Sequence, residues 1–362
     1  MAKTNGIAET RAPTLPTHGA KSLPRVEIES YSVQLDDEEG FLGDRASKGA
    51  FVEIVEDIRR RLRQAGEDPL GETPTEEIPR KKLGALLAKG EPEAAAVVQS
   101  AVEDFARQLY TVIRRFLRLR SWREVECIVV GGGFRGSRVG ELAIGRAGIL
   151  LKSDDVKVDL QLIHHDPDEA GLIGAAYLLP RWMVEGHDAM LAADVGGTNV
   201  RVGVVELNLG KHADLSRASV ADIELWCHAQ EKELKRDHAV DRMIKMFEKA
   251  LSSAKKRKLR LAPVIGIGCP GVIEPDGSIA RGAQNLPGNW ESSKFNLPHC
   301  IREHLPQIGE HETLVVMHND AVVQGLSELP HLEGREHWGI LTIGTGLGNA
   351  SFTRRSEPPK KN

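Results

Sequence analysis

The chain has 362 residues, of which 28% are charged and 41% hydrophobic, a composition typical of a folded globular protein and not of a disordered one. Its 48 basic and 52 acidic residues give a formal net charge of −4, which argues against a generally basic nucleic-acid-binding protein. No apolar run approaches the roughly 18 residues that a membrane span needs. We therefore expect neither a nucleic-acid partner nor a membrane partner.

Cysteine usage and the first residues bear on the compartment. The four cysteines are far apart and form no CxxC pair, so their spacing predicts neither a disulfide framework nor a zinc site. Residues 1–24 mix Thr, Pro, Gly and charged residues and lack the apolar stretch of a secretory signal. We expect a flexible tail there and a cytoplasmic protein.

The first third of the chain alternates short structured segments with loops. A strand is expected over residues 25–35, and apolar residues at three- and four-residue steps predict a helix over 51–62. Residues 67–91 are rich in Pro, Gly and charge around one short helix. A long amphipathic helix over 94–116 then leads into a short strand at 126–130.

Further along, three glycines follow that strand, and small residues over 168–179 predict a helix that Asp168 is placed to cap and Pro180 to end. From residue 190 the pattern changes to paired strands, with one helix expected over 240–251. The expected strands are 191–194, 200–207, 263–268, 314–317, 338–343 and 347–354.

Two of these strand pairs share one design, in which an apolar strand leads into a turn of Gly and Thr and a second strand returns. Glycine lets the backbone approach a ligand closely and aims its N–H groups at one point, as an anionic phosphate requires. The first turn contains Asp194, Gly196, Gly197, Thr198 and Asn199, and the second contains Gly344, Thr345 and Gly346. Each turn alone is equally typical of a plain β-hairpin. Two facing hairpins could clamp a polyphosphate, with Asp194 holding Mg²⁺ through water.

Asn319 and Asp320 stand where a strand ends and a helix begins. Either residue type is common there as a helix cap. The functional alternative is a carboxylate that takes a proton from an attacking hydroxyl, with Asn319 holding a neighbouring hydroxyl.

A rival interpretation uses the glycine-rich segment that begins with Gly131, Gly132 and Gly133. It fits the pattern G-x-G-x-x-G between a strand and a helix, and Asp154 and Asp155 follow about 20 residues on, as in a dinucleotide site. That interpretation leaves the two hairpins and the Asn-Asp pair unexplained.

Two loops carry weaker signals. The sequence His164-His165-Asp166 could suggest a metal, but no further ligand is apparent, which favours a polar loop. Asn285 places an amide on a loop, as a sugar site would need.

Together these motifs resemble the sugar-kinase branch of the actin-like ATPase superfamily, and more narrowly the ROK and glucokinase-like families. The likeness covers most of residues 90–355. The matching segments are 194–199 and 344–348 for the two phosphate motifs, 266–271 for the turn before the sugar loop, 285–286 for the start of that loop, 318–320 for the catalytic pair, 131–133 for the adenosine-side turn and 170–176 for the closing helix. The resemblance implies a two-domain α/β fold of the actin-like ATPase (ribonuclease H-like) class.

The order of the motifs differs from that of the family, in which the first phosphate motif is near the N-terminus and the closing helix is last. Here the closing helix precedes the first phosphate motif, which predicts a circular permutation with the old termini joined through about residues 180–190. The expected domains are 25–180 plus 336–362 on the nucleotide side and 190–335 on the sugar side, with 181–189 as linker. We expect the hairpin over 339–354 to share a sheet with segments 25–35 and 126–130.

The sugar side also departs from the family. Its Glu-x-Gly-His segment should lie near the N-terminus after permutation, where Glu27 can stand for the first Glu while Ser30 replaces the His. Gly43 replaces a second sugar-binding Glu, and the zinc cysteines of the family are absent.

The resemblance therefore implies an ATP- and Mg²⁺-dependent hexose kinase. Asp320 would be the base, Asn319, Asn285 and Glu27 would bind the sugar, and the three glycine turns would bind ATP. Two alternatives stay open: a non-catalytic sugar- or nucleotide-binding relative, and a dinucleotide-binding oxidoreductase. A homodimer is compatible with each.

Overall fold

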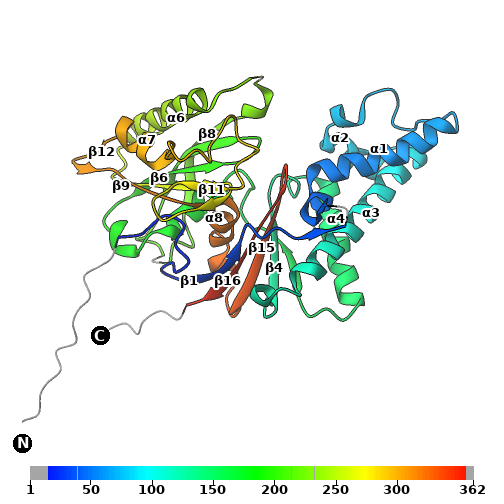
Figure 1. Ribbon diagram of the computed structural model, residues 1–362, viewed down its shortest axis with the longest axis horizontal. Helices are drawn as coiled ribbons and strands as arrows, with labels where there is room; N and C mark the ends of the chain where they lie inside the picture. Colours follow the sequence, from blue (N-terminus) through cyan, green and yellow to red (C-terminus); the bar gives the residue numbers. More distant parts are fainter. Residues whose placement is uncertain (1–14, 39, 213, 232, 356–362) are drawn as a thin grey trace, which may run out of the picture.

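The computed structural model describes residues 15–38, 40–212, 214–231 and 233–355. Figure 1 shows three parts: a helical unit on the right, a five-stranded sheet in the middle, called the first sheet below, and another five-stranded sheet with its helices on the left, called the second sheet. Within the described residues, no helix is long and apolar enough to cross a membrane.

The first sheet joins strands from both ends of the chain. Its order is β1 (Val26–Tyr31), β16 (Leu347–Arg354), β15 (His337–Ile343), β4 (Cys127–Gly131) and β5 (Asp159–Leu162). β1, β16 and β15 are antiparallel neighbours, whereas β15, β4 and β5 run parallel. The prediction that hairpin 339–354 shares a sheet with 25–35 and 126–130 is thereby confirmed.

The second sheet has the same order of strand directions. It contains β8 (Ser219–Trp226), β7 (Val200–Glu206), β6 (Ala189–Val195), β9 (Leu261–Cys269) and β14 (Leu314–Asn319). β8, β7 and β6 are antiparallel, and β6, β9 and β14 run parallel. A meander of three strands followed by two parallel strands, present twice, is the ribonuclease H-like arrangement of the actin-like ATPases, as predicted.

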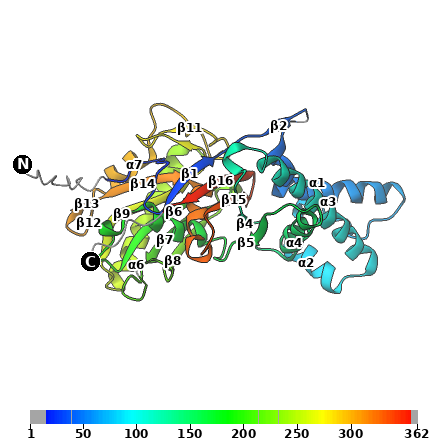
Figure 2. The ribbon, with the colours of Figure 1, turned by 90° about the horizontal axis from the view of Figure 1, so that it is seen from below.

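A helical unit is inserted between the first two strands of the first sheet, β1 and β4 (blue to cyan in Figures 1 and 2). The Ser47 hydroxyl caps its first long helix by accepting a hydrogen bond from the Ala50 N–H. The buried ring of Phe105 contacts those of Phe51 and Phe134, with centroids 5.7 and 4.7 Å apart. The inserted helices are α1 (Lys48–Gln64), α2 (Arg80–Lys89) and α3 (Pro92–Phe116). A fourth helix, α4 (Arg138–Ser153), connects β4 to β5 and packs against α2 and α3.

Two short helices, α5 (Ala170–Ala175) and α8 (Asp320–Leu326), pack against each other between the sheets. A Cβ on Gly174 would lie 1.8 Å from the Val323 carbonyl oxygen, so only glycine permits this contact. α5 packs on β6 and β9 of the second sheet, although its residues were expected to belong with 25–180. α8 follows β14 but also packs on β15 and β16 of the first sheet.

The remaining elements complete the second sheet and its surroundings. α6 (Arg236–Lys256) covers β7 and β8, and α7 (Leu297–His304) packs beside β14. The short strands are β2 (Asp36–Asp37), β3 (Gly40–Phe41), β10 (Val272–Ile273), β11 (Ile279–Arg281), β12 (Gln307–Ile308) and β13 (His311–Glu312). The 3-10 helices are Leu42–Ala46, Thr75–Glu77, Arg120–Trp122, Ala176–Leu178, Arg181–Met183, His228–Gln230 and Leu329–His331.

Two local expectations were wrong. Asp168 does not cap α5, because its carboxylate instead accepts hydrogen bonds from the Arg201 guanidinium at 2.5 and 2.8 Å. Part of the expected flexible tail is bound to the fold, because the Gly19 N–H donates to the Met317 carbonyl at the edge of β14 and His18 Nδ1 accepts from the Met317 N–H. The part of that tail formed by residues 1–14 lies outside the described residues.

Candidate functional site

A cleft of about 590 Å³ opens between the two sheets and the helical unit. Both glycine hairpins, the turn after β4, the start of α8 and the loop before β2 contribute to its walls. Every predicted site residue except Glu27 and Gly131 lines it. The cleft thus brings together segments that are up to about 300 residues apart in the chain.

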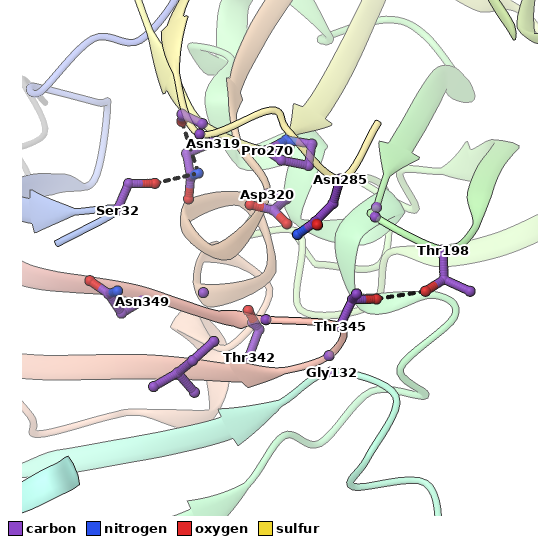
Figure 3. A pocket seen from close by; sticks show the side chains of 18 of the residues that line it. Ser32, Gly132, Thr198, Pro270, Asn285, Asn319, Asp320, Thr342, Thr345 and Asn349 are labelled. Atoms are coloured by element: carbon purple, nitrogen blue, oxygen red, sulfur yellow. Dashed lines mark hydrogen bonds between the residues drawn. The ribbon is translucent and has the colours of Figure 1, made fainter. Parts of the chain in front are cut away.

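The two glycine hairpins meet face to face across this cleft. The hydroxyl oxygens of Thr198 and Thr345 lie 2.7 Å apart and share a hydrogen bond (Figure 3). Within each turn, a glycine N–H donates to a carbonyl of the same turn, from Gly196 to Asn199 and from Gly344 to Gly346. The facing arrangement predicted for the hairpins is therefore present in the structure.

The turn after β4 packs directly against the backbone of the second hairpin. Gly132 has a φ of +79°, and a Cβ there would lie 2.6 Å from the Ile343 carbonyl oxygen, so the position requires glycine. Gly132 and Gly133 line the cleft. Gly131 does not, because it is the last residue of β4, paired with Thr342, and a Cβ on it would face Gln324 instead.

The dinucleotide interpretation of this glycine turn is wrong in geometry. The turn precedes α4, whereas Asp154 and Asp155 follow its last residue. A helix of 16 residues places these carboxylates about 24 Å from the turn. A dinucleotide site needs its acidic residue near the carboxyl end of the next strand, but β5 begins only at Asp159.

Asp320 is the first residue of α8 and exposes its carboxylate to the cleft (Figure 3). Burial, and next the neighbouring Asp194 carboxylate, raise the pKa of Asp320 to about 7, opposed by hydrogen bonds from nearby N–H groups. A carboxyl group that titrates near neutral pH is matched to the exchange of protons with a bound hydroxyl group.

Asn319 is buried and uses its whole side-chain amide within the protein. Its Oδ1 accepts hydrogen bonds from the N–H groups of Ala321 and Val322, which caps α8. Its Nδ2 donates to the Ser32 hydroxyl at 3.1 Å and to the Gly271 carbonyl at 3.0 Å. Because an amide has two donor and two acceptor positions, a direct sugar contact of the predicted kind would have to displace one of these partners.

Asp194 is the last residue but one of β6, just before the first glycine turn. Its Oδ2 accepts from the Arg201 guanidinium at 3.3 Å, whereas its buried Oδ1 has no hydrogen-bond partner among the described residues. Burial raises the pKa of Asp194, and the Arg201 guanidinium opposes that shift.

These residues fit a hydrated magnesium ion. Protein sites for Mg²⁺ often use only one or two carboxylates, and substrate phosphates and water supply the other ligands. Asp194 and Asp168 both line the cleft, and the unpartnered Asp194 Oδ1 is an oxygen of the required kind. No group of three or more His, Cys, Asp or Glu side chains within the described part of the chain could hold a metal alone.

The sugar-binding residues expected near the N-terminus do not reach the cleft. Glu27 pairs with Thr353 in the first sheet and lies outside the lining. The Ser30 hydroxyl is engaged by Ser351 and by the Trp122 indole N–H. A Cβ on Gly43 would lie 2.6 Å from the ring of Phe41, so no larger residue fits there without a shift.

The neighbouring segment from Ser32 onward lines the cleft instead, and no motif in the sequence predicts this. Ser32 has a φ of +48°, which lets the chain leave β1 and turn into the cleft. The buried Asn349 holds the next residue, since its side-chain amide exchanges two hydrogen bonds of 3.0 Å with the Val33 backbone. Other lining residues that sequence reasoning missed are Lys48, Arg80, Asp168, Arg201, Arg281, Gln324 and Thr342.

The histidine loop after β5 lies outside the cleft lining. His164 donates its backbone N–H to the buried Glu328, and its Nδ1 lies 2.7 Å from the same carboxylate. Its ring stacks on that of His331, with centroids 4.1 Å apart. The loop therefore joins the first sheet to the segment after α8.

No protein-family model matches the chain, and no curated protein matches it either. Solved structures similar to part of it include the Lmo2764 protein of Listeria monocytogenes, proposed to be an N-acetylmannosamine kinase, at 24% identity and a TM-score of 0.32 over 46% of this chain and 47% of that chain. A ROK hexokinase from Thermus thermophilus is 22% identical, with a TM-score of 0.32 over 44% of this chain and 45% of that one. A PPX-GPPA enzyme from Aquifex aeolicus is 14% identical, with a TM-score of 0.25 over 42% and 48%. Each of these three matches spans less than half of the similar chain, and likenesses this low carry no argument about activity.

Proposed function

We propose that this protein is a cytoplasmic kinase that transfers the γ-phosphoryl group of ATP to a primary hydroxyl group of a sugar. The observation that carries the proposal is the position of Asp320, whose pKa is about 7, in a cleft closed on one side by two facing glycine hairpins. A proton acceptor beside a polyphosphate cradle is the arrangement that phosphoryl transfer to an alcohol requires.

In the proposed reaction, Asp320 accepts the proton of the sugar hydroxyl, and that oxygen attacks the γ-phosphorus in line. A bond forms between this oxygen and phosphorus, and the bond from phosphorus to the β–γ bridging oxygen breaks, which leaves ADP with the electron pair. The N–H groups of the two hairpins bind the phosphate oxygens. Because the hydroxyls of Thr198 and Thr345 share one hydrogen bond, the pair adds one further donor. A magnesium ion held through water by Asp194 would supply neutralisation of phosphate charge.

On the acceptor side, Asn285 lines the cleft and can bind a sugar hydroxyl. Ser32 and Gln34 also line it and replace the expected Glu27. We therefore propose that these uncharged polar side chains select the hexose. The second sugar-binding Glu of the family is replaced by Gly43, so position 43 supplies no carboxylate.

We also propose that the chain is circularly permuted relative to the family that it resembles. The repeated sheet order supports this, because the third strand of the first meander is β1 while its first two strands are β15 and β16. Residues between the short helix Ala176–Leu178 and β6 would be the join. The proposed nucleotide-side and sugar-side domains are then the two halves that these sheets define.

A non-catalytic binding relative is the second candidate. Two observations favour it: Gly43 stands where a carboxylate was expected, and Asn319 has all its hydrogen bonds within the protein. A nucleotide could still bind such a protein, but no sugar would be phosphorylated.

A coupled assay of ADP release over a panel of hexoses separates these candidates. We expect turnover with at least one hexose and a fall in kcat of about 10²–10⁴-fold for Asp320→Asn, since the substitution removes only the proton acceptor. Asp237→Asn is the matched control, because Asp237 is an exposed carboxylate in the first turn of α6. Full turnover by Asp320→Asn, or no turnover of any sugar by the wild type, counts against the kinase.

A further inference from the structure

Two cationic side chains from the helical unit reach the nucleotide side of the cleft. Lys48 is the first residue of α1, and Arg80 is the first residue of α2. Both line the same cleft as the two glycine hairpins. Neither was assigned a role by the motifs in the sequence.

The position of Lys48 is fixed by the second hairpin. Its backbone N–H donates to the Gly344 carbonyl at 3.0 Å, which joins the start of α1 to the phosphate turn. Its ammonium lies against the other glycine turn, because a Cβ on Gly133 would be 3.0 Å from Lys48 Nζ. One side chain thus spans from the turn at 344–346 to the turn at 131–133.

Arg80 lies against the same glycine turn from α2. Its guanidinium carbon is 5.8 Å from the ring centroid of Phe134, the residue that follows Gly133. Its Nη1 is buried and has no hydrogen-bond partner within the described part of the chain. A buried guanidinium donor without an acceptor is costly, so the pocket is incomplete without an acceptor.

The two cations are close enough to repel each other. Burial lowers the pKa of Lys48, and the nearby guanidinium groups of Arg80 and Arg201 lower it further. Asp168 opposes this shift, but its carboxylate is already hydrogen-bonded to Arg201. Two like charges gathered with no carboxylate bonded to either, among the residues described, form a site prepared for an anion.

We propose that Lys48 and Arg80 form a cationic subsite that binds the polyphosphate chain of the nucleotide between the turns at 131–133 and 344–346. This inference rests on the proposed function and names the residues that would hold the nucleotide's charge. Lys48 neutralises the phosphates nearest the turn at 131–133, and Arg80 donates to them through Nη1. The N–H groups at the start of α1, capped by Ser47, add positive potential on the same side.

Calorimetric titration of the full chain with ATP–Mg²⁺ and with inorganic tripolyphosphate tests the subsite. Lys48→Met and Arg80→Met remove the charge but keep an apolar stem. We expect each to weaken binding of both probes by about tenfold or more, and Lys48→Arg to restore most of it. Lys82→Met, on the exposed side of the same helix α2, should leave both affinities unchanged.

Thermal unfolding without ligand provides a second readout. Lys48→Met removes one of two cations that repel each other, so we expect its unfolding temperature to be equal to or higher than that of the wild type. With that result, weaker binding by the variant is not caused by misfolding. Unchanged affinities in Lys48→Met and Arg80→Met would overturn the subsite and leave the proposed kinase intact.

The two probes also separate the sources of the polyphosphate. Tripolyphosphate binding that depends on Lys48, in a wild type that neither binds ATP–Mg²⁺ nor phosphorylates a sugar, would show that the two cations bind an anion other than a nucleotide. That result would overturn both the kinase and the assignment of the subsite to the nucleotide. A wild type that binds neither probe would overturn both.

Discussion

The hydroxyl oxygens of Thr198 and Thr345 lie 2.7 Å apart although 147 residues separate them in the chain. This hydrogen bond directly joins the tips of the two glycine hairpins, one from each sheet. It holds the tips together while leaving both hydroxyls exposed to the cleft.

This pair predicts a measurable coupling. Thr198→Val and Thr345→Val each remove the same hydrogen bond, so the double variant should lose about 0.5–1 kcal/mol less stability to urea than the two single losses added together. Thr198→Val combined with the distant Thr111→Val should give additive losses. Additivity of the Thr198 and Thr345 substitutions would show that the hairpin tips do not interact in solution.

The raised pKa of Asp320 predicts a pH-dependent stability. The folded state binds this proton more tightly than the unfolded state, whose aspartate titrates near 3.8, so the contribution of Asp320 to stability falls as the pH rises from about 4 to about 7. Asp320→Asn removes that fall. The variant should therefore unfold at a higher urea concentration than the wild type at pH 8, and the advantage should vanish near pH 4. An identical pH dependence for both proteins would contradict the raised pKa.

Asn319→Ala tests whether the hydrogen bonds of the Asn319 side-chain amide stabilise the fold. It removes the cap of α8 and leaves the Gly271 carbonyl and the Ser32 hydroxyl without a partner. We expect a loss of about 2–4 kcal/mol in the free energy of unfolding by urea. Ser32→Ala removes one of the four hydrogen bonds and should cost about 1 kcal/mol. Equal, small losses of unfolding free energy in the two variants would mean that the Asn319 hydrogen bonds contribute little to stability.

Gly174 offers a sharp contrast with another helical glycine. Gly174→Ala places a Cβ 1.8 Å from the Val323 carbonyl oxygen and must push α5 and α8 apart. We expect it to lower the free energy of unfolding by about 2 kcal/mol or more. Gly145→Ala in α4 meets nothing within 4 Å and should stabilise the protein by up to about 1 kcal/mol. Thermal unfolding of both variants measures the difference, and similar unfolding temperatures would show that the helices do not touch as described.

Prediction from sequence worked where a strand or helix is buried and failed where it is not. All seven residues of β6 are buried, and its apolar sequence marked it as a strand. The edge strand β8 is largely exposed and β5 is only half-buried, so neither carries an apolar pattern, and both were missed. Strands such as β5 and β8 form because a neighbouring strand offers free backbone groups, which their own sequences do not record.

The candidate site divides in the same way. The glycine turns and Asp320 could be found from sequence, because turns and strand ends have local signatures. Ser32, Lys48 and Arg80 could not, since each reaches the cleft only through the packing of segments distant in the chain. Glu27 was assigned from its motif position alone, and the register of β1 against β16 places it outside the cleft.

Because β1 pairs with β16, the first sheet cannot be completed until late in synthesis on the ribosome. The Ser30 and Ser351 hydroxyls share a hydrogen bond across these strands, yet 321 residues separate them. At translation rates of about 5–20 residues per second, β1 leaves the ribosome some tens of seconds before its partner exists. Through that interval the backbone groups that β16 will bind stay unpaired, so the nascent chain exposes an open strand edge. The first sheet therefore closes only when β16 has emerged, and until then its open edge is a site at which a chaperone would limit aggregation.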